Sequence, residues 1–230
     1  MAAANTGVWW ILLMRLRRKK NLDTRIERCA HLLVTQPEAF RGRWLEQFGF
    51  DALHVELGCG KGRFTVETAK AQPRVLIVAL EKLFDAMIIA LERAGTENNG
   101  NTRFVNALAD NITDYFAQGE VSRIYINFCD PWPTNRRAKR RLTCRRFLEL
   151  YREILCPGGE LHFKTDNLPL FEFSLREFEY SGFIPFDIAY DLHKDGPVGI
   201  MTDYELKFYN QGIPIYSARS RPQISCAEVL

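Results

Sequence analysis

Short apolar runs alternate with amphipathic segments along most of the chain. The continuous apolar and β-branched run 75–80 predicts a strand that is buried on both faces, 124–128 predicts another buried strand, and the short, largely apolar stretch 53–57 predicts a further strand. Residues between them carry apolar side chains at helical spacing, and Gly95 and Gly182 follow two of the expected helices. This alternation predicts an α/β protein with a doubly wound, mostly parallel sheet.

The other expected elements fill most of the remaining chain. Further strands are expected at 103–106 and 160–164, and helices at 64–71, 83–94, 111–116, 143–155 and 168–180. Pro157, Gly158 and Gly159 predict a turn that ends one of these helices. The last part changes character, because 184–190, 206–209 and 215–219 all resemble strands. With no helix expected between the last two, an antiparallel hairpin is predicted at one edge of the sheet.

Composition narrows the class of protein. The chain has 230 residues, of which 47% are hydrophobic and 26% charged, as in a globular protein with a sizeable core. The apolar stretch 8–14 is too short to span a bilayer, and its charges follow it, unlike those of a secretory signal. We expect residues 1–13 to be an upstream extension and residues 14–230 to form one domain.

Six cysteines and four histidines are scattered along the chain, with no C-x-x-C pair. This spacing argues against a metal site and against a disulfide framework, and it favours reduced thiols in the cytoplasm. His54 and His162 fall within predicted strands, where core or sheet-face positions are expected for them. No metal and no membrane partner are therefore expected.

Charge is distributed unevenly, although the formal net charge is only +3. Residues 15–28 hold seven basic and two acidic side chains, and residues 136–146 hold seven basic side chains and no acid. Such an asymmetry suggests a polyanionic partner that binds at a defined place. The alternative is a pair of solvated helix faces.

Four acids lie at the ends of predicted strands. They are Glu56, Glu81, Asp130 and Asp166. Ligands of a doubly wound sheet bind outside the carboxyl ends of the strands, so these acids predict a site at that edge.

A glycine loop, E-L-G-C-G-K-G, follows the first of these strands. Its spacing fits neither the P-loop nor the dinucleotide form G-x-G-x-x-G. Gly58 and Gly60 would let the backbone approach a ligand closely. Glu81 closes the next strand, where a carboxylate accepts hydrogen bonds from a ribose diol. A glycine loop and a ribose acid, in a chain that ends in a predicted β-hairpin, together favour S-adenosylmethionine over NAD.

The stretch Asp130-Pro131-Trp132-Pro133 begins directly before the second basic segment. Prolines on both sides of Trp132 exclude a helix, so a stiff loop is predicted that holds an acid and an aromatic face in place. The alternative is a Trp that plugs the sheet edge beside an Asp that starts a turn. Arginines just beyond the loop suit contacts with a phosphate backbone.

Four motifs now carry a family resemblance: VELGCGKGRF, DPWP followed by RRAKRRLT, FKTDN and MTDYELKF. With them the chain, from Met14 to about Ser217, resembles the bacterial tRNA (guanine-N7)-methyltransferases of the TrmB type. The resemblance implies a class I methyltransferase fold, Rossmann-like with a seven-stranded sheet. It also implies methyl transfer from S-adenosylmethionine to N7 of a guanine in the tRNA variable loop.

The resemblance also assigns roles to single positions. Asp130 is the expected catalytic residue. Expected cofactor-binding residues are Glu56, Gly58, Gly60, Glu81, Leu108 and Asp130, and expected substrate-binding residues are Thr134, Asp166, Thr202, Asp203, Tyr204 and Glu205. Expected phosphate contacts are Arg136, Arg137, Lys139, Arg140 and Arg141. Two positions depart from the family, which commonly has an acid in place of Leu108 and a lysine in place of Thr134.

The chemistry of guanine N7 explains why a carboxylate suffices as the catalytic group for methyl transfer. N7 carries an in-plane lone pair and no proton, so no strong base is needed, and an acid can stabilise the positive charge that develops on the ring. Two alternatives stay open: an exocyclic-amino RNA methyltransferase, and an RNA-binding protein on the same fold with weak or lost catalysis. A monomer and a homodimer are equally compatible with the sequence.

Overall fold

A computed structural model describes residues 22–97 and 100–223. Seven strands form one sheet in the order β3-β2-β1-β4-β5-β7-β6. Neighbouring strands are parallel from β3 to β5, and β7 runs antiparallel to both β5 and β6. The strands are β1 (Ala52–Leu57), β2 (Val75–Leu80), β3 (Thr102–Val105), β4 (Val121–Asn127), β5 (Leu155–Thr165), β6 (Phe183–Ala189) and β7 (Tyr216–Pro222).

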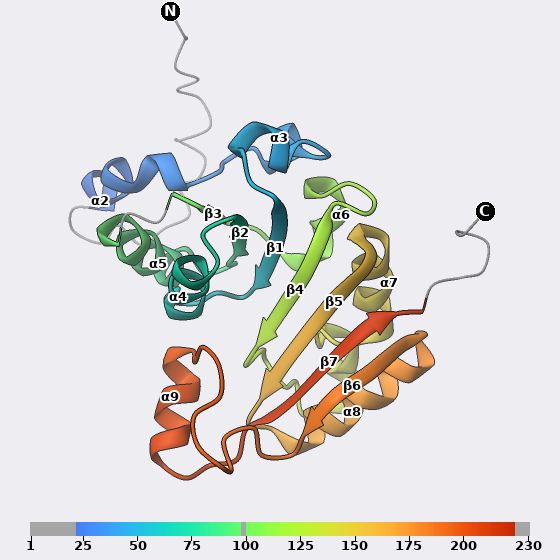
Figure 1. Ribbon diagram of the computed structural model, residues 1–230. Helices are drawn as coiled ribbons and strands as arrows, with labels where there is room; N and C mark the ends of the chain where they lie inside the picture. The colour runs from blue at the N-terminus through green and yellow to red at the C-terminus, as the bar shows by residue number, and fades with distance from the viewer. Residues whose placement is uncertain (1–21, 98–99, 224–230) are drawn as a thin grey trace, which may run out of the picture.

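Helices lie on both faces of this sheet (Figure 1). The α-helices are α2 (Leu22–Cys29), α3 (Trp44–Phe48), α4 (Arg63–Ala71), α5 (Phe84–Thr96), α6 (Ile112–Tyr115), α7 (Arg145–Ile154), α8 (Leu168–Tyr180) and α9 (Asp203–Asn210). Four 3₁₀ helices are η1 (Ala30–Leu32), η2 (Pro37–Phe40), η3 (Ala109–Asn111) and η4 (Asn135–Arg140). The expected doubly wound, mostly parallel sheet with an antiparallel edge is confirmed.

Alternation along β1 separates two cores. Leu53, Val55 and Leu57 point into the larger core, which α7 and α8 cover. The smaller core lies between the sheet and α2, α4 and α5, and includes Met87 and Phe104. Because period-2 side chains face opposite sides, His54 and Glu56 lie on the second face of β1.

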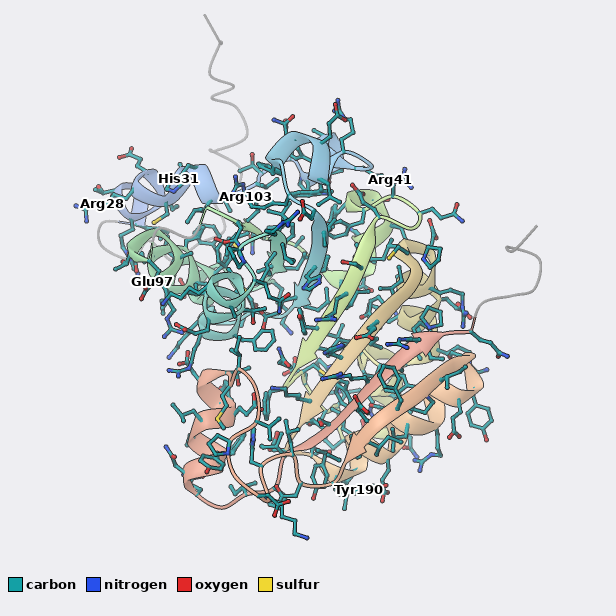
Figure 2. The ribbon with its side chains drawn as sticks, in the orientation of Figure 1. Arg28, His31, Arg41, Glu97, Arg103 and Tyr190 are labelled. Atoms are coloured by element: carbon teal, nitrogen blue, oxygen red, sulfur yellow. The ribbon has the colours of Figure 1, made fainter. Side chains whose placement is uncertain are left out.

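The N-terminal region has more structure than the sequence predicts. Residues 1–13 and the first half of the basic segment 15–28 lie outside the described residues, but Arg25 and Arg28 belong to α2. Arg25 binds Glu92 of α5 through two hydrogen bonds of 2.6 and 2.7 Å. Arg28 is exposed and lies with His31 on the outer side of α2 and η1 (Figure 2). One of these two arginines is therefore used in packing and the other is open to solvent.

The prediction of a strand at 206–209 is wrong, because these residues belong to α9. Thr202 begins this helix with a capping box: its hydroxyl accepts from the Glu205 N–H at 2.9 Å, and the Glu205 carboxylate accepts from the Thr202 N–H at 3.2 Å. Such a cap satisfies amide groups that a helix start leaves open. The antiparallel pair at the edge of the sheet is formed by β6 and β7, and α9 lies in the connection between them.

The turn expected at Pro157-Gly158-Gly159 lies within the bounds of β5. Leu155 pairs with Val121 and Glu160 pairs with Arg123, so the residues between them bulge out of the ladder. Gly158 has a φ of 79°, which only glycine adopts without strain. The helix does end here as predicted, but a bulged strand follows it in place of a separate turn.

His54 and His162 occupy the sheet face predicted for them. The rings of both contact Tyr125 edge-on, and the Tyr125 hydroxyl lies 3.3 Å from His54 Nδ1. Burial, aided by the nearby charges of Arg123 and His162, lowers the pKa of His54 to about 3. His54 is therefore neutral in the folded protein at neutral pH.

This pKa predicts an acid-sensitive fold. The unfolded chain has the ordinary histidine pKa of 6.5 and binds the proton more readily than the folded one, so acid favours unfolding. Stability that His54 contributes above pH 6.5 should fall by on the order of 2 kcal/mol on reaching pH 5. Urea unfolding of the wild type and of His54→Gln across this range measures the difference. Equal slopes against pH in the two proteins would contradict a neutral His54.

Candidate functional site

The four predicted acids lie along one edge of the sheet. Glu56 is in β1, Glu81 directly follows β2, Asp130 comes shortly after β4, and Asp166 directly follows β5. These four strands are mutually parallel, so their carboxyl ends form a single rim. Glu56 and Glu81 are buried, whereas Asp130 and Asp166 are exposed. The rim therefore has a buried acidic part at β1 and β2 and an open one at β4 and β5.

The glycine loop is fastened to the end of β2. The N–H groups of Gly58 and Cys59 donate to the Leu80 carbonyl at 2.8 and 3.2 Å. The Glu81 carboxylate accepts from the Gly60 N–H at 2.9 Å and from the Leu83 N–H at 2.7 Å. These two backbone donors fix the orientation of the Glu81 carboxylate at the edge of the loop.

The three glycine positions of the loop differ in the space around them. All have φ in the left-handed region, at 77° for Gly58, 55° for Gly60 and 75° for Gly62. A Cβ built at Gly58 or Gly60 would meet no atom within 4 Å, whereas one at Gly62 would lie 2.5 Å from the Cβ of Ala90. Gly62 therefore permits close packing of the α4 start on α5, and the other two leave open space along the loop.

This cradle fits the cofactor that the resemblance implies. The open backbone of Gly58 and Gly60 leaves room for a ligand, and the oriented Glu81 carboxylate retains acceptor capacity for a ribose. Two large apolar side chains nearby are exposed: Leu83, which follows β2, at 60%, and Leu108, which follows β3, at 52%. An aromatic base would cover apolar surface of this kind. The residues present therefore fit S-adenosylmethionine.

Glu56 lies beneath the loop, with 1% of its surface exposed. Its carboxylate accepts from the Thr65 hydroxyl of α4 at 2.5 Å and from the Asn127 amide of β4 at 3.3 Å. Burial raises the pKa of Glu56 to about 7, against the opposing effect of these hydrogen bonds. The side chain ties β1, α4 and β4 together below the rim.

The loop after β4 is rigid and strained. Phe128 has a φ of 52° and Trp132 a φ of 40°, so two non-glycine residues in left-handed conformation bracket Asp130. Residues in this region cost about 1–3 kcal/mol each and cluster at functional sites. The Asp130 carboxylate forms an ion pair of 2.9 Å with Lys82, which follows Glu81. Asp130 thus faces the end of β2, across β1.

The second basic segment forms η4 and the start of α7. Arg136, Arg137, Lys139 and Arg140 are exposed, and the guanidinium groups of Arg137 and Arg140 lie 5.7 and 5.0 Å from the centre of the Trp132 ring. Thr134, at one of the two departures from the family, is an exposed residue at the start of η4. Contact between these exposed cations and RNA phosphates remains a prediction.

Arg141 differs from the other cations in this segment. It is 8% exposed, and its guanidinium donates to the backbone carbonyls of Pro131 and Trp132. Its side chain is therefore engaged inside the protein, not presented on the basic surface where a phosphate contact was expected.

The segment 202–205 is held at the rim by a buried ion network. Both oxygens of Glu205, which is 0% exposed, accept from Lys164 Nζ at 2.9 and 3.1 Å, and its Oε1 lies 3.0 Å from His193 Nε2. Asp203 pairs with Arg93 of α5 at 3.0 Å, and Tyr204 is exposed. The carboxylate of Glu205 is thus occupied, while Tyr204 is open to solvent.

Three residues of this region were not singled out from the sequence. Lys82 directly follows Glu81, Lys164 lies within FKTDN, and His193 comes from the long connection between β6 and β7. Lys82 and Lys164 could have been considered from their places beside rim acids. His193 carries no local signal, because only the fold brings it to Glu205.

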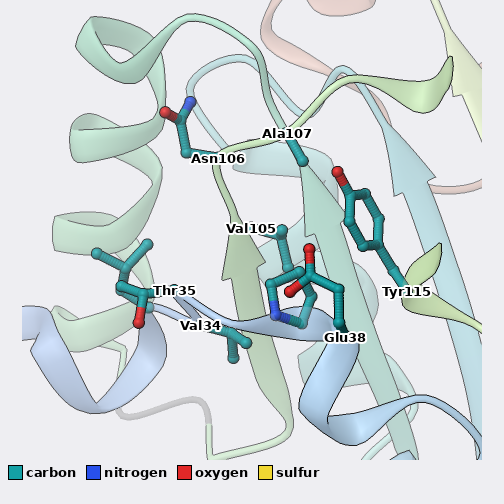
Figure 3. Close-up of a pocket in the computed structure, with 9 residues that line it drawn as sticks. Val34, Thr35, Glu38, Val105, Asn106, Ala107 and Tyr115 are labelled. Atoms are coloured by element: carbon teal, nitrogen blue, oxygen red, sulfur yellow. The ribbon is translucent and has the colours of Figure 1, made fainter. Parts of the chain in front are cut away.

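A separate pocket of about 110 Å³ lies at the outer edge of β3 (Figure 3). Its walls come from η2 and the chain before it, from the end of β3 and the residues after it, and from α6, and they include Glu38, Asn106 and Tyr115. Asn106 also donates its side-chain amide to the Glu81 carbonyl at 2.7 Å. The pocket therefore adjoins the rim at β3 but contains none of the four acids.

Two findings concern other classes of site. Within residues 22–97 and 100–223, no group of three or more His, Cys, Asp or Glu is placed to hold a metal ion. Nor does any helix in these residues have both the length and the apolar character needed to cross a membrane.

The strand order, the antiparallel β7 and the glycine loop after β1 define a Rossmann-like methyltransferase fold, and solved structures agree. The 16S rRNA methyltransferase KamB matches with a TM-score of 0.60 and 16% identity over 78% of this chain and 93% of KamB. An antibiotic-related methyltransferase matches with a TM-score of 0.59 and 18% identity over 80% and 94%.

A third structure is a mutant of the 16S rRNA (adenine(1408)-N(1))-methyltransferase from Catenulisporales acidiphilia with the cosubstrate SAM. It matches with a TM-score of 0.56 and 16% identity over 80% of this chain and 93% of the other. Residues 51–218 match the sequence profile of the Methyltransf_4 family, described as "Putative methyltransferase". The chain belongs to this methyltransferase family.

The loop glycines give a matched pair of variants. Gly62→Ala forces a Cβ against Ala90, so its free energy of unfolding should fall by on the order of 3 kcal/mol. Gly60→Ala meets no neighbour, so it should lose only about 1 kcal/mol from the left-handed φ, yet bind S-adenosylmethionine at least about 10-fold more weakly.

Urea unfolding and calorimetric titration with the cofactor separate the two effects. Adding Ala90→Gly to Gly62→Ala removes the closest of the three Ala90 atoms near the new Cβ and should restore part of the lost stability. Unchanged cofactor affinity in a folded Gly60→Ala protein would show that the ligand does not approach this loop.

Proposed function

We propose that this protein transfers a methyl group from S-adenosylmethionine to N7 of a guanine in tRNA. The observation that carries the proposal is the position of Asp130. An exposed carboxylate, paired with the lysine that follows Glu81, lies in a strained loop that leads into a run of exposed arginines. This arrangement suits a nucleic-acid base that becomes positively charged as it accepts a methyl group.

The cofactor, when bound, supplies an electrophilic methyl group, and the residues of this chain do the rest. Glu81 orients the ribose, and the backbone of Gly58 and Gly60 admits the ligand closely. Asp130 stabilises positive charge on the guanine ring as it forms, since N7 has no proton to remove. The rigid backbone around Asp130 keeps the carboxylate in place, so little free energy is spent on orienting it during the reaction.

Lys82 has a defined part in this scheme. Its ammonium group lies 2.9 Å from the Asp130 carboxylate. Both side chains are at least half exposed, so the pair contributes little to stability and can open readily. We infer that the incoming base displaces Lys82 from the carboxylate, and that the positive charge developing on the methylated ring then compensates Asp130 in place of the ammonium group.

The substrate is held from two sides. Asp166, Thr202, Asp203 and Tyr204 face the base from the ends of β5 and α9, while Glu205 supports them from below through its bonds to Lys164 and His193. Arg136, Arg137, Lys139 and Arg140 bind phosphates beside Trp132. Thr134 supplies a hydroxyl where the related enzymes have a cation, and neighbouring arginines provide the charge.

The choice of tRNA over ribosomal RNA rests on the motifs. The solved structures named above include 16S rRNA methyltransferases, but at 16–18% identity they share the fold with this chain and little else. DPWP with its basic run, TDN and TDYELKF resemble the tRNA guanine-N7 enzymes over most of the chain.

Methyl transfer from labelled cofactor to unmodified tRNA and to 30S subunits tests the proposal. Digestion of the RNA should give labelled 7-methylguanosine from tRNA, and borohydride with aniline should cleave that RNA at the modified position. Labelled 1-methyladenosine from 30S subunits would assign the protein to the other substrate. An N-methylated exocyclic amine would support amino-group chemistry.

The role of Asp130 predicts a specific kinetic defect. Asp130→Asn keeps the shape of the side chain and removes its charge, so the rate of single-turnover methylation should fall by about 10²–10³-fold. The Kd for tRNA should stay within about 2-fold, because the arginines that bind phosphates are untouched. Asp51→Asn, an exposed acid paired with Arg74 before β1, is the control and should methylate like the wild type. A fully active Asp130→Asn protein would refute the electrostatic role.

Binding of S-adenosylmethionine distinguishes an enzyme from an RNA-binding protein that lacks catalysis, and Leu108 is the position where that binding is tested. If its exposed side chain packs on the adenine, Leu108→Ser should weaken S-adenosylmethionine binding by about 5-fold, from the loss of roughly 1 kcal/mol of apolar contact. Ile184→Ser, at a similarly exposed residue of β6, is the control and should bind like the wild type. A wild-type protein that binds tRNA tightly and shows no cofactor saturation would support the non-catalytic alternative.

A further inference from the structure

Arg141 is a buried cation without a carboxylate partner in the described part of the chain. It directly follows η4, and 8% of its surface is exposed. No Asp or Glu oxygen among the described residues lies within ion-pair distance of its guanidinium, in contrast to Arg146, which pairs with Asp110. Burial of an uncompensated charge costs free energy, so the position calls for a compensating role.

The guanidinium is engaged with the loop that carries Asp130. Its Nε donates to the Pro131 carbonyl at 3.0 Å and to the Trp132 carbonyl at 3.3 Å, and an Nη donates to the Trp132 carbonyl at 2.9 Å. On its other side it lies 4.3 Å from the centre of the Phe173 ring in α8. A fork of donors on two successive carbonyls, fixed against an aromatic face, holds this backbone in one orientation.

The loop needs such a constraint. Pro131 and Pro133 have no N–H, so they cannot donate hydrogen bonds that would fix the loop. Trp132 has an unfavourable left-handed φ of 40°, and Phe128 on the other side of Asp130 has one of 52°. Conformations of this kind persist only where surrounding contacts maintain them. The three hydrogen bonds from Arg141 supply contacts of that type.

Arg141 also joins the loop to the basic surface. Arg137 and Arg140, in the helix that Arg141 follows, lie on the Trp132 side chain, while Arg141 binds the Trp132 backbone. The same residue of the loop is therefore held by an exposed pair of cations and by a buried one.

We propose that Arg141 is a positioning residue for methyl transfer, which holds the Pro131–Trp132 backbone so that Asp130 meets the reacting base, and that it does not contact RNA phosphates. The role rests on the proposed function, because it acts through Asp130. This role differs from that of the neighbouring basic residues. Loss of Arg141 should impair the chemical step, whereas loss of Arg136 should impair RNA binding.

The test compares single-turnover methylation and RNA binding in three variants. Arg141→Lys keeps the charge but loses the fork, so its maximal rate should fall by about 10- to 100-fold while the Kd values for tRNA and cofactor stay within about 3-fold. Arg136→Ala should show the reverse, with weaker tRNA binding and a nearly normal rate at saturation. Arg74→Lys, an exposed arginine at the opposite end of the sheet, is the control and should match the wild type.

Chemical rescue adds a readout that a general loss of stability would not give. Millimolar guanidinium should restore at least about 3-fold of the rate lost in Arg141→Ala, and methylammonium should not, because only guanidinium can bridge the two carbonyls. The inference is overturned if Arg141→Lys reacts at the wild-type rate, or if its defect lies in tRNA affinity.

Two further measurements test the inference if the wild type is inactive or if the Arg141 variants do not fold. Trp132 emission, isolated by subtraction of Trp132→Phe spectra, should become more accessible to acrylamide in Arg141→Lys, and this readout does not depend on any methylation activity. An inactive wild type would refute the proposed function, and the acrylamide measurement would then still decide whether Arg141 holds the Pro131–Trp132 backbone. If Arg141 variants do not fold, Phe173→Leu is the substitute. It should lose less methylation rate than expected for Arg141→Lys, at unchanged tRNA affinity, and a normal rate would contradict the positioning role of Arg141.

Discussion

The site depends on one constraint: the backbone must turn from β1 into α4 beside the end of β2 without side chains in the way. Hydrogen bonds from Gly58 and Cys59 to the Leu80 carbonyl, and from Gly60 to the Glu81 carboxylate, attach this turn to the neighbouring strand. Gly62 then lets α4 start in contact with Ala90 of α5. Since α4 covers the face on which Glu56 and His54 lie, the same turn closes the smaller core and leaves the ligand cradle open.

Buried charge is used around this cradle to fix position. Glu205, Lys164 and His193 form a network that attaches α9 to the end of β5, and Arg141 attaches the Asp130 loop to α8 and η4. Burial of such groups stabilises a fold weakly, since desolvation offsets much of the attraction, but their hydrogen bonds are directional. The exposed groups between them, Asp130 and Tyr204 among them, are therefore presented on a rigid frame.

Much of the fold followed from the pattern of side chains. Apolar runs at β1, β2 and β4 have the composition of strands buried on both faces, and parallel strands with helical crossovers leave few topologies. The places of Glu56, Glu81, Asp130 and Asp166 at the rim follow from the same pattern, because each lies at or just beyond a strand end. The prediction of a strand at 206–209 is wrong because four residues are too few to show whether apolar side chains repeat with helical or strand spacing. These residues belong to α9, whose start depends on the cap that Thr202 and Glu205 form.

The sequence by itself determined the buried strands, the glycine loop, the stiff loop at Asp130 and the concentration of positive charge after it, since each is a local property of neighbouring residues. Only the tertiary structure decided which charges are free to act. Arg140 and Arg141 are adjacent and chemically identical, yet one lies on the Trp132 ring at the surface and the other is buried against Phe173. Burial depends on what packs from α8, far along the chain. For the same reason Glu205 supports the site from inside, because residues 164 and 193 meet it only in the folded protein.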